Sequence, residues 1–346
     1  MKRVPAAGRR TFLKSSLGPL SIPFFSRASA QGREGVAPSR RITLGFIGIG
    51  KMNSDHLRFF SQDPEFQILA LCDVESLRLE RGKQIVVDHY QTRYPNGFKG
   101  LSLYEDFRDL LARTDMDAVV IATPDHWHAL TAIAACKAGK DVYCEKPMAN
   151  SIREGRAMVE AARRYGRVFQ TGSMQRSNQT FRFACELVRN GRIGDVQKVY
   201  VNVGGPPEDC FLPAQPCPST LNWEMWLGPA PWRPYNTELC PMDNWKVFPN
   251  WRGYREFGGG GITDWGTHQA ALAQYANAAE MSSPVRYEQR GSDEVVARYA
   301  NGVRLVFHAG IPDGACLMAR FEGSEGWISV DDNLGFEAEP VSLLGA

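Results

Sequence analysis

Residues 42–53 read Ile-Thr-Leu-Gly-Phe-Ile-Gly-Ile-Gly-Lys-Met-Asn, an apolar run that leads through a Gly-x-Gly turn into a helical pattern around residues 56–60. In a strand, turn and helix of this kind, glycines let the backbone approach a ligand, and the helix N-terminus offers free N–H groups to a pyrophosphate. Asn53 stands where a third glycine would serve close helix–strand packing. We expect a dinucleotide-binding turn made by Gly48, Gly50, Lys51 and Met52.

The next predicted strand, residues 67–72, ends in an acid. Asp73 lies about 25 residues beyond the turn, close to the usual spacing of roughly 20. A carboxylate in this position can bind the ribose hydroxyls and repel a 2′-phosphate. NAD is therefore expected in preference to NADP.

Strands and helices alternate from here to residue 171. We expect further strands at residues 118–122, 141–144 and 168–171, and helices at residues 77–89, 104–112, 128–138 and 152–165. This alternation predicts a parallel, doubly wound sheet with ligands at the carboxyl ends of its strands. Two stretches, 122–128 and 141–147, lie at such ends. The cofactor contacts expected from them are Thr123, Pro124, His126, Trp127, Glu145 and Lys146.

A charged pair, Glu145 and Lys146, directly follows the predicted strand and precedes Pro147. Proline disfavours the α region for the residue before it, so Lys146 is expected on a stiff, extended backbone. A Glu-Lys pair alone is more often a solvated ion pair, but Asp264 and His268 form a second acid/base pair downstream. Their spacing of four places them on one helix face, where the carboxylate can bind substrate or orient the imidazole and raise its pKa.

After residue 172 the pattern changes. A helix at residues 177–190 and a strand at 196–203 precede short segments at 285–287, 294–299, 303–308, 319–322 and 327–330. These segments lie between Gly and Asn turns, as antiparallel strands do, and Asn301-Gly302 is the clearest hairpin signal. We expect an α/β protein with a Rossmann domain over residues 41–172. An α+β domain with an open, mostly antiparallel sheet and helices on one face follows over residues 173–346.

Composition excludes several classes of protein. The 346 residues are 43% hydrophobic with a net charge of +2, which is typical of a soluble globular protein and argues against a nucleic-acid partner. No Cys/His spacing resembles a zinc site. We expect Cys72, Cys136 and Cys144 to be buried thiols. A bridge among the cysteines at 210, 217 and 240 stays open.

Six tryptophans fall in one segment that is also rich in Pro and Gly: Trp223, Trp226, Trp232, Trp245, Trp251 and Trp265. Such a segment suggests an ordered wall built from loops. Its aromatic faces can stack on sugar C–H groups, but simple core filling explains each ring equally well.

Residues 1–30 predict an export signal. Arg9-Arg10-Thr-Phe-Leu-Lys precedes a modestly apolar run and the small-x-small site at residues 28–30, as in a twin-arginine signal. The apolar run is too short, and too broken by Pro19 and Pro23, to span a membrane. We expect a mature chain that starts near Gln31, is exported to the periplasm or beyond by the twin-arginine machinery, and is not stably inserted in a membrane.

The motifs together resemble the Gfo/Idh/MocA (glucose-fructose oxidoreductase/inositol dehydrogenase) family, and particularly its exported bacterial branch, over about residues 41–345. They are Gly48-x-Gly50, Asp73, Ala122 to His128, Glu145-Lys146-Pro147, Gly191-Arg192-Ile193-Gly194 and Asp264-x-x-x-His268. The resemblance implies that Lys146 and His268, aided by Asp264, serve proton transfer while a hydride passes between a secondary alcohol and the nicotinamide. It also implies pairing of two subunits through the free face of the second sheet. Further candidates for lining a sugar pocket are Arg176, Tyr254 and Trp265.

Two departures from the family stand out. Ala271 replaces an acid that often follows the histidine by three residues, and relatives generally continue past the equivalent of Ala346. Three functions stay open: a sugar, polyol or glycoside oxidoreductase; a glycosidase or lyase that oxidises a sugar carbon transiently, as the family's NAD-dependent N-acetylgalactosaminidases do; and a non-catalytic sugar-binding protein. Because NAD is scarce outside the cytoplasm and twin-arginine export carries folded proteins, an exported enzyme of this type is expected to hold its cofactor and recycle it in place.

Overall fold

The first sheet forms around the apolar run at residues 42–47. β1 (Ile42–Ile47), of which the last four residues are buried, pairs in parallel with strands on both sides. The other strands are β2 (Phe66–Cys72), β3 (Ser102–Tyr104), β4 (Ala118–Ile121), β5 (Asp141–Glu145) and β6 (Phe169–Gly172). Their order is β3-β2-β1-β4-β5-β6, and each neighbouring pair is parallel. The predicted doubly wound sheet is confirmed, and the carboxyl ends of its strands share one edge.

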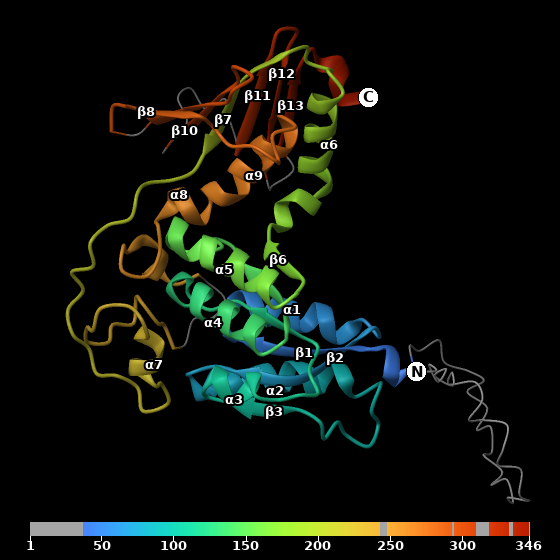
Figure 1. Cartoon of the computed structure of the whole chain (residues 1–346), viewed down its shortest axis with the longest axis vertical. Helices are drawn as coiled ribbons and strands as arrows, with labels where there is room; N and C mark the ends of the chain where they lie inside the picture. The colour runs from blue at the N-terminus through green and yellow to red at the C-terminus, as the bar shows by residue number, and fades with distance from the viewer. Residues whose placement is uncertain (1–36, 243–247, 293, 309–317, 332–334, 346) are drawn as a thin grey trace, which may run out of the picture. The chain divides into compact units, whose positions relative to one another are not determined.

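Helices cover both faces of this sheet (Figure 1). They are α1 (Lys51–Gln62), α2 (Ser76–Tyr90), α3 (Phe107–Leu111), α4 (Asp125–Lys137) and α5 (Ile152–Arg164). α1 and α2 bury Leu57 and Val86 against one face, whereas α3, α4 and α5 pack on the other. The predicted helix at residues 104–112 was wrong at its start. Tyr104 ends β3, and Asp106 caps α3 by accepting from Arg108 N (2.8 Å).

The computed structural model describes residues 37–346 except 243–247, 293, 309–317, 332–334 and 346. The predicted signal at residues 1–30 and Trp245 lie outside the described residues. Residues 38–346 form one compact unit. Within the described ranges, no helix is long and apolar enough to cross a membrane.

The second sheet is built around β7 (Val196–Asn202), in the order β13-β12-β11-β7-β10-β9-β8. The other strands are β8 (Arg286–Arg290), β9 (Glu294–Arg298), β10 (Arg304–His308), β11 (Ala319–Gly323), β12 (Trp327–Val330) and β13 (Phe336–Glu339). Among the described strands of this second sheet, only β7 and β10 pair in parallel, which confirms a mostly antiparallel sheet. The predicted hairpin at residues 301–302 joins β9 to β10, and Gly302 has a φ of 89°. The short β13 was not predicted.

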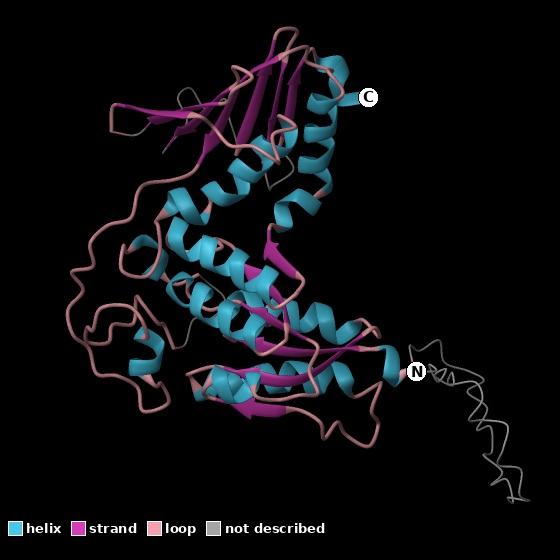
Figure 2. Ribbon diagram, viewed as in Figure 1, coloured by secondary structure: helices cyan, strands magenta, loops and turns pink. Residues whose placement is uncertain are grey.

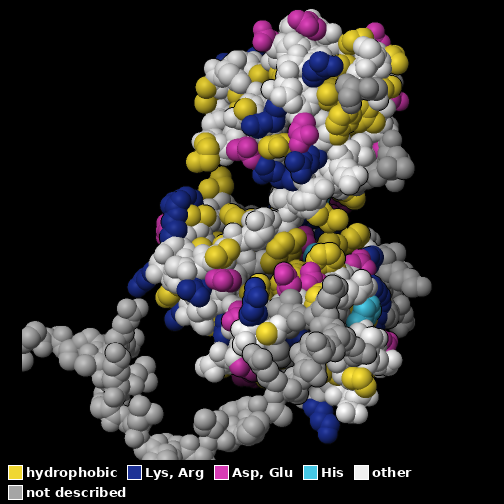
Figure 3. Space-filling view, turned by 90° about the vertical axis from the view of Figure 1, so that its right-hand side faces the viewer, with side chains coloured by type: hydrophobic (Ala, Val, Ile, Leu, Met, Phe, Trp, Pro, Cys, Tyr) yellow, Lys and Arg dark blue, Asp and Glu magenta, His cyan; other side chains and the backbone are white. Residues whose placement is uncertain are grey.

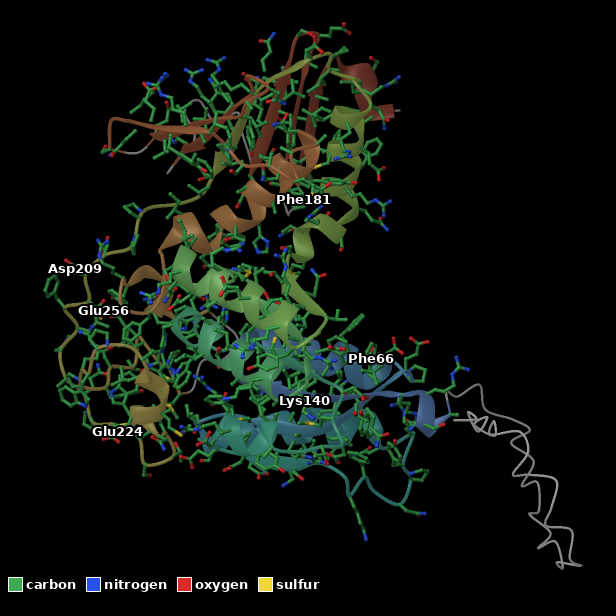
Figure 4. The ribbon with its side chains drawn as sticks, in the orientation of Figure 1. Phe66, Lys140, Phe181, Asp209, Glu224 and Glu256 are labelled. Atoms are coloured by element: carbon green, nitrogen blue, oxygen red, sulfur yellow. The ribbon has the colours of Figure 1, made fainter. Side chains whose placement is uncertain are left out.

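Two helices, α6 (Gln179–Arg189) and α9 (Gly266–Ala276), cover one face of this sheet. Phe181, labelled in Figure 4, is fully buried in their shared core. α6 begins two residues later than predicted because Asn178 caps it, accepting from the backbone N–H groups of Thr180 and Phe181. The remaining short helices are η2 (Pro38–Arg40), η3 (Met174–Ser177), α7 (Trp223–Leu227), η4 (Asn250–Gly253), α8 (Gly261–Asp264) and η6 (Val341–Gly345).

Residues 203–260, here called the tryptophan-rich segment, link β7 to α8, and the described part of the segment is mostly loop (Figure 2). In Figure 4 the segment is marked by Asp209, Glu224 and Glu256. The segment has its own core, in which the rings of Trp223 and Trp226 stack with centroids 4.6 Å apart. Trp251 belongs to the same core, so these three rings serve to fill it. Trp232, by contrast, is 76% exposed.

The described cysteines are all free thiols. Cys72, Cys136 and Cys144 are buried, as predicted. Cys210 and Cys240 are buried and Cys217 is exposed, and no bridge joins them. Basic and acidic side chains are interspersed over the face shown in Figure 3, in keeping with the small net charge.

Candidate active site

A pocket lies at the carboxyl ends of β1, β2 and β4. The predicted cofactor contacts that line it are Gly48, Gly50, Lys51, Met52, Asp73, Thr123, Pro124 and Trp127. The tryptophan-rich segment forms the other wall, through Met225, Trp226, Leu239, Phe248, Pro249, Trp251 and Arg252. The two domains therefore share the pocket. The sequence suggested a wall built from loops in this segment, but for stacking on a sugar, and its place at the dinucleotide pocket was not predicted.

The Gly-x-Gly turn is shaped by close backbone packing. Gly48 has a φ of 81°, and a Cβ added there would lie 2.9 Å from the carbonyl oxygen of Ala122, so only glycine fits. A Cβ added at Gly50 would meet nothing within 4 Å, which leaves space for a ligand beside the backbone. α1 starts directly after this turn and offers its first N–H groups there.

The hydrogen bonds of Asn53 explain why an asparagine can stand in place of the third glycine. Its side chain is fully buried, and its amide nitrogen donates to the carbonyl oxygens of Gly48 (2.7 Å) and Ile47 (3.1 Å). These bonds tie the first turn of α1 to the end of β1. The asparagine thus tethers the turn through its side chain, at a position where a glycine would only allow close packing.

Asp73 links the end of β2 to the same turn. Its Oδ2 accepts from Ile49 N (2.6 Å), and its Oδ1 accepts from Glu75 N (2.9 Å). Burial raises the pKa of Asp73 above its ordinary value, although Arg78 opposes this shift. Each carboxylate oxygen has a second lone pair, which can accept from a ribose hydroxyl.

The pocket also contains polar atoms that await a partner. Among the described residues, Thr123 Oγ1 and Arg78 Nε are buried and have no hydrogen-bond partner in the protein. A buried polar group without a partner is unfavourable by about 1–3 kcal/mol. A bound dinucleotide offers acceptors to both atoms, so the residues present fit NAD.

The predicted catalytic residues come together beside this pocket. Lys146, at the end of β5, donates from Nζ to the carboxylate of Asp264 and to its backbone carbonyl oxygen (3.1 Å). The Lys146 and Asp264 side chains are each 15% exposed. Asp264 ends α8 and His268 lies in α9, so Trp265 separates two short helices where one was predicted.

His268 is buried, and its environment differs from the prediction. Burial, followed by the positive charge of Lys146, lowers the pKa of His268 to about 4. Asp264 raises the pKa of His268, in the direction considered from the sequence, but burial and Lys146 outweigh this effect. The imidazole is therefore neutral near pH 7. Its Nδ1 is buried and has no partner among the described residues.

Two charged residues near this cluster were missed. Arg252 Nε lies 3.5 Å from Asp264 Oδ2, and burial lowers the pKa of Arg252. Asp125, at the start of α4, is buried, and burial raises its pKa well above the ordinary value. Asp125 belongs to the strand-end stretch at residues 122–128, which was the available signal. Arg252 lies in a loop without periodicity, so the sequence gave no signal for it.

Three other predicted cofactor contacts do not line the pocket. His126 Nε2 bonds to the carbonyl oxygen of Trp226 (3.0 Å), and burial lowers its pKa to about 4. Glu145 Oε1 lies 2.8 Å from His56 Nε2. Lys146 is occupied by Asp264, as described above. These side chains hold the walls of the site around the pocket.

The candidates for a sugar pocket are dispersed. Arg176 pairs with Glu280 and lies over the ring of Tyr275, 4.9 Å from its centroid. Tyr254 donates from its hydroxyl to Glu238 (3.4 Å). Trp265 adjoins the catalytic cluster: its ring centroid is 6.4 Å from that of His268, and its side chain is 47% exposed.

Comparison with known proteins identifies two domains of one family. The model "Oxidoreductase family, NAD-binding Rossmann fold" (GFO_IDH_MocA) matches residues 42–173. The model "Oxidoreductase family, C-terminal alpha/beta domain" (GFO_IDH_MocA_C2) matches residues 201–307. Together they span more than half of the chain, and the first makes its domain an NAD-binding Rossmann domain.

Curated relatives match over slightly less than half of the chain. An inositol 2-dehydrogenase of Salmonella typhimurium is 30% identical over 46% of this chain and 45% of its own length. A glycosyl hydrolase family 109 protein of Shewanella baltica is 31% identical over 46% of this chain and 35% of its own. An uncharacterized oxidoreductase of Bacillus subtilis, YrbE, is 31% identical over 45% and 42% respectively. The chain thus spans less than half the length of these relatives.

Solved structures are similar over most of the chain. The WlbA dehydrogenase of Bordetella pertussis, in complex with NADH and UDP-GlcNAcA, is 20% identical over 84% of this chain and 77% of its own, with a TM-score of 0.56. The aldose-aldose oxidoreductase of Caulobacter crescentus is 22% identical over 86% and 80%, with a TM-score of 0.57. At these identities the likeness concerns the fold. With both domains matched in order, the chain belongs to the Gfo/Idh/MocA family of oxidoreductases.

Proposed function

We propose that the protein is an NAD-dependent oxidoreductase that transfers a hydride between tightly held NAD and a secondary hydroxyl of a sugar, polyol or glycoside. The observation that carries this proposal is the buried meeting of Lys146 with Asp264 beside His268. This cluster is joined to the dinucleotide pocket by Arg252, which lines the pocket and contacts Asp264.

The chemistry requires a group that takes the hydroxyl proton while the carbon loses its hydride. NAD, when bound, supplies the hydride acceptor. The proposed proton acceptor is Lys146 Nζ, and the carboxylate of Asp264 fixes the direction of that amine. Neutral His268 has a free ring nitrogen, Nδ1, that can bond to the same hydroxyl.

Tight retention of the cofactor is supported by how the tryptophan-rich segment is fastened to the first domain. Ser76 N donates to Thr220 O (3.0 Å), and Asn222 N donates to Val74 O (2.9 Å). Arg78 adds a bond from Nη2 to the carbonyl oxygen of Pro241 (2.9 Å). These contacts flank Asp73, where the ribose of the dinucleotide is expected, and so favour slow release of the ligand.

The substrate class is argued from relatives and from the exposed ring of Trp265. Inositol 2-dehydrogenase acts on a polyol by its name, and the named Caulobacter enzyme acts on aldoses. Trp265 offers an aromatic face for sugar C–H groups next to His268. We extend the proposal to export through a twin-arginine signal at residues 1–30, and to pairing of two subunits through the free face of the second sheet.

A second candidate function is redox-neutral cleavage of a glycoside. It is favoured by the 31% identity to glycosyl hydrolase family 109 proteins. In that reaction the same residues would oxidise a sugar carbon, allow elimination of the neighbouring substituent and return the hydride. Net NADH formation separates the two functions.

The test starts with the purified protein. Denaturation should release NAD(H), identified by its mass and ultraviolet absorbance. The native protein is then mixed with myo-inositol, aldoses and p-nitrophenyl glycosides while absorbance at 340 nm is followed. A stoichiometric change with a sugar or polyol supports the oxidoreductase, whereas p-nitrophenol release without lasting change at 340 nm supports the glycosidase. Absence of dinucleotide, even after soaking with NAD, would contradict both and favour a sugar-binding protein.

A further inference from the structure

A second carboxylate, that of Glu105, stands beside Asp73 at the edge of the first sheet. β2 and β3 pair in parallel with Cys72 opposite Tyr104. The next residue of each strand, Asp73 and Glu105, therefore leaves the sheet beside the other, at the strand spacing of about 4.8 Å. Asp73 N donates to Tyr104 O (3.2 Å), which holds the two strand ends together. Both acids line the dinucleotide pocket.

The side chain of Glu105 is exposed, yet it is held from the second domain. Its Oε1 accepts from Asn222 Nδ2 (2.6 Å). Asn222 is itself fixed, because its backbone N–H donates to Val74 O (2.9 Å) and its Oδ1 accepts from Met225 N (3.1 Å) at the start of α7. An exposed glutamate without such a contact samples several rotamers. The hydrogen bond to Asn222 keeps the charge of Glu105 at the pocket.

A second cavity, of about 370 Å³, adjoins the dinucleotide pocket at the same two acids. Asp73 and Glu105 line both spaces. The cavity is also lined by residues that carry hydroxyl groups: Ser76, Ser219 and Thr220. Its volume far exceeds the ~30 Å³ that one water occupies in the liquid, and hydroxyl groups can donate to phosphate oxygens. Neither the space nor a lack of donors therefore excludes a phosphate beside Asp73.

The charges around this cavity are unfavourable for a phosphate. Of the described residues that line it, two are acids and none is Lys or Arg. Arg78, whose charge acts on Asp73, lines the dinucleotide pocket but not the cavity. Its Nη2 already donates to Pro241 O (2.9 Å). A phosphate monoester carries about −1.5 to −2 charges at pH 7, so a 2′-phosphate on a ribose at Asp73 would face two carboxylates.

We propose that Glu105, held by Asn222, is a specificity-determining residue that excludes NADP by its charge, while Asp73 accepts from the ribose hydroxyls of NAD. The inference deepens the proposed function and rests on the dinucleotide pocket of that function. A like charge placed against the wrong ligand gives specificity without any contact to the right one. Because Asn222 belongs to the tryptophan-rich segment, the choice of cofactor depends on both domains.

The test compares the two dinucleotides that the full-length protein binds. The protein is incubated with an excess of NAD and NADP in equal amounts, separated from free nucleotide and denatured, and the released dinucleotides are quantified by mass spectrometry. If bound cofactor exchanges slowly, the same mixture is present while the protein refolds from urea. In Glu105→Gln, the ratio of bound NADP to bound NAD should rise about tenfold, the order expected for one charge facing a phosphate near a protein surface. Glutamine keeps an oxygen that can accept from Asn222.

Two further variants separate charge from position. Asp109→Asn is the matched control, because Asp109 is an exposed acid in the first turn of α3 that lines neither space, and its ratio should stay near that of the wild type. Asn222→Ser loses the amide donor but keeps an oxygen for Met225 N, and should raise the ratio by a smaller factor than Glu105→Gln. Added salt should weaken the discrimination of the wild type more than that of Glu105→Gln, because salt screens charges at the surface.

An unchanged ratio in Glu105→Gln, or an equal rise in Asp109→Asn, would overturn the proposal. The same holds for a wild type that binds both dinucleotides equally, or whose discrimination does not respond to salt. A loss of NAD binding in Glu105→Gln that matches its loss of NADP binding would show a structural role instead. A protein that binds NAD selectively but oxidises no sugar would contradict the proposed hydride transfer, while the ratios would still decide the role of Glu105. Turnover with an unchanged ratio would contradict this inference alone.

Discussion

Replacing Asn53 by glycine restores the usual dinucleotide fingerprint, yet the structure predicts a less stable protein. The variant loses the amide donor to Gly48 O and Ile47 O. Ile47 O keeps a second donor, Ala122 N at 3.0 Å, so the main loss falls on Gly48 O. One buried carbonyl left without its partner is unfavourable by about 1–3 kcal/mol, and glycine in a helix by about 1 kcal/mol. The variant also removes Asn53 Oδ1, a buried oxygen without a partner among the described residues, so we expect a net loss of at most about 3 kcal/mol.

The assay is urea unfolding followed by far-ultraviolet circular dichroism. A loss of about 3 kcal/mol lowers the midpoint by roughly 1 M. Asp55→Gly is the matched control: Asp55 lies in the same helix with its side chain 50% exposed, so the helix term applies together with the loss of its exposed ion pairs to Lys51 and Arg58, which contribute little. Dinucleotide retention should weaken in Asn53→Gly alone, because the tethered turn faces the pocket. A variant as stable as wild type, or no less stable than the control, would refute the reasoning.

Three further predictions concern the site. In Lys146→Ala, turnover should fall by about 10²–10⁴ with the fold and bound NAD retained; undiminished turnover would exclude Lys146 as the base. His126 and His268 have pKa values of about 4 when folded, against about 6.5 when unfolded, so the unfolded state binds more protons between these limits. The free energy of unfolding should therefore fall as pH drops from about 6.5 to 4, by ~3 kcal/mol per imidazole at most, which urea midpoints at pH 7 and pH 5 measure. Gly228 has a φ of 48°, and an added Cβ would lie 2.0 Å from the Trp127 ring, so Gly228→Ala should lower the melting temperature and speed NAD release. Unchanged release would show that this contact does not hold the tryptophan-rich segment against the first domain.

The sequence was most informative where local chemistry repeats along the chain. The alternation of apolar strands and helices predicted five strands of the first sheet, and Asn301-Gly302 located a hairpin. β3 was not predicted, because its three half-buried residues are too few to show an alternating pattern. The parallel pairing of β7 with β10 joins segments about a hundred residues apart, which no local pattern encodes.

The same contrast between local patterns and long-range contacts applies to the residues of the site. Lys146, Asp264 and His268 were found through motif spacing, and the structure brings them together. The net pKa of His268 could not be predicted from the sequence, because burial and the contact with Lys146 depend on the three-dimensional fold and outweigh the effect of Asp264. Arg252 was missed for a similar reason. Its role depends on a loop folding back onto another domain, and the loop carries no repeating signal.

The tryptophan-rich segment, which forms the second wall of the pocket, is synthesised after the first domain. Lining residues of the first domain end at Thr131, whereas those of the tryptophan-rich segment begin at Met225. At about 5–20 residues per second, a ribosome leaves roughly 5–20 s between the two. During that interval a cytoplasmic dinucleotide can enter an open site without displacing anything. Refolding of the whole chain from denaturant offers no such interval, so cofactor loading should be more complete when NAD is present before dilution than when it is added afterwards.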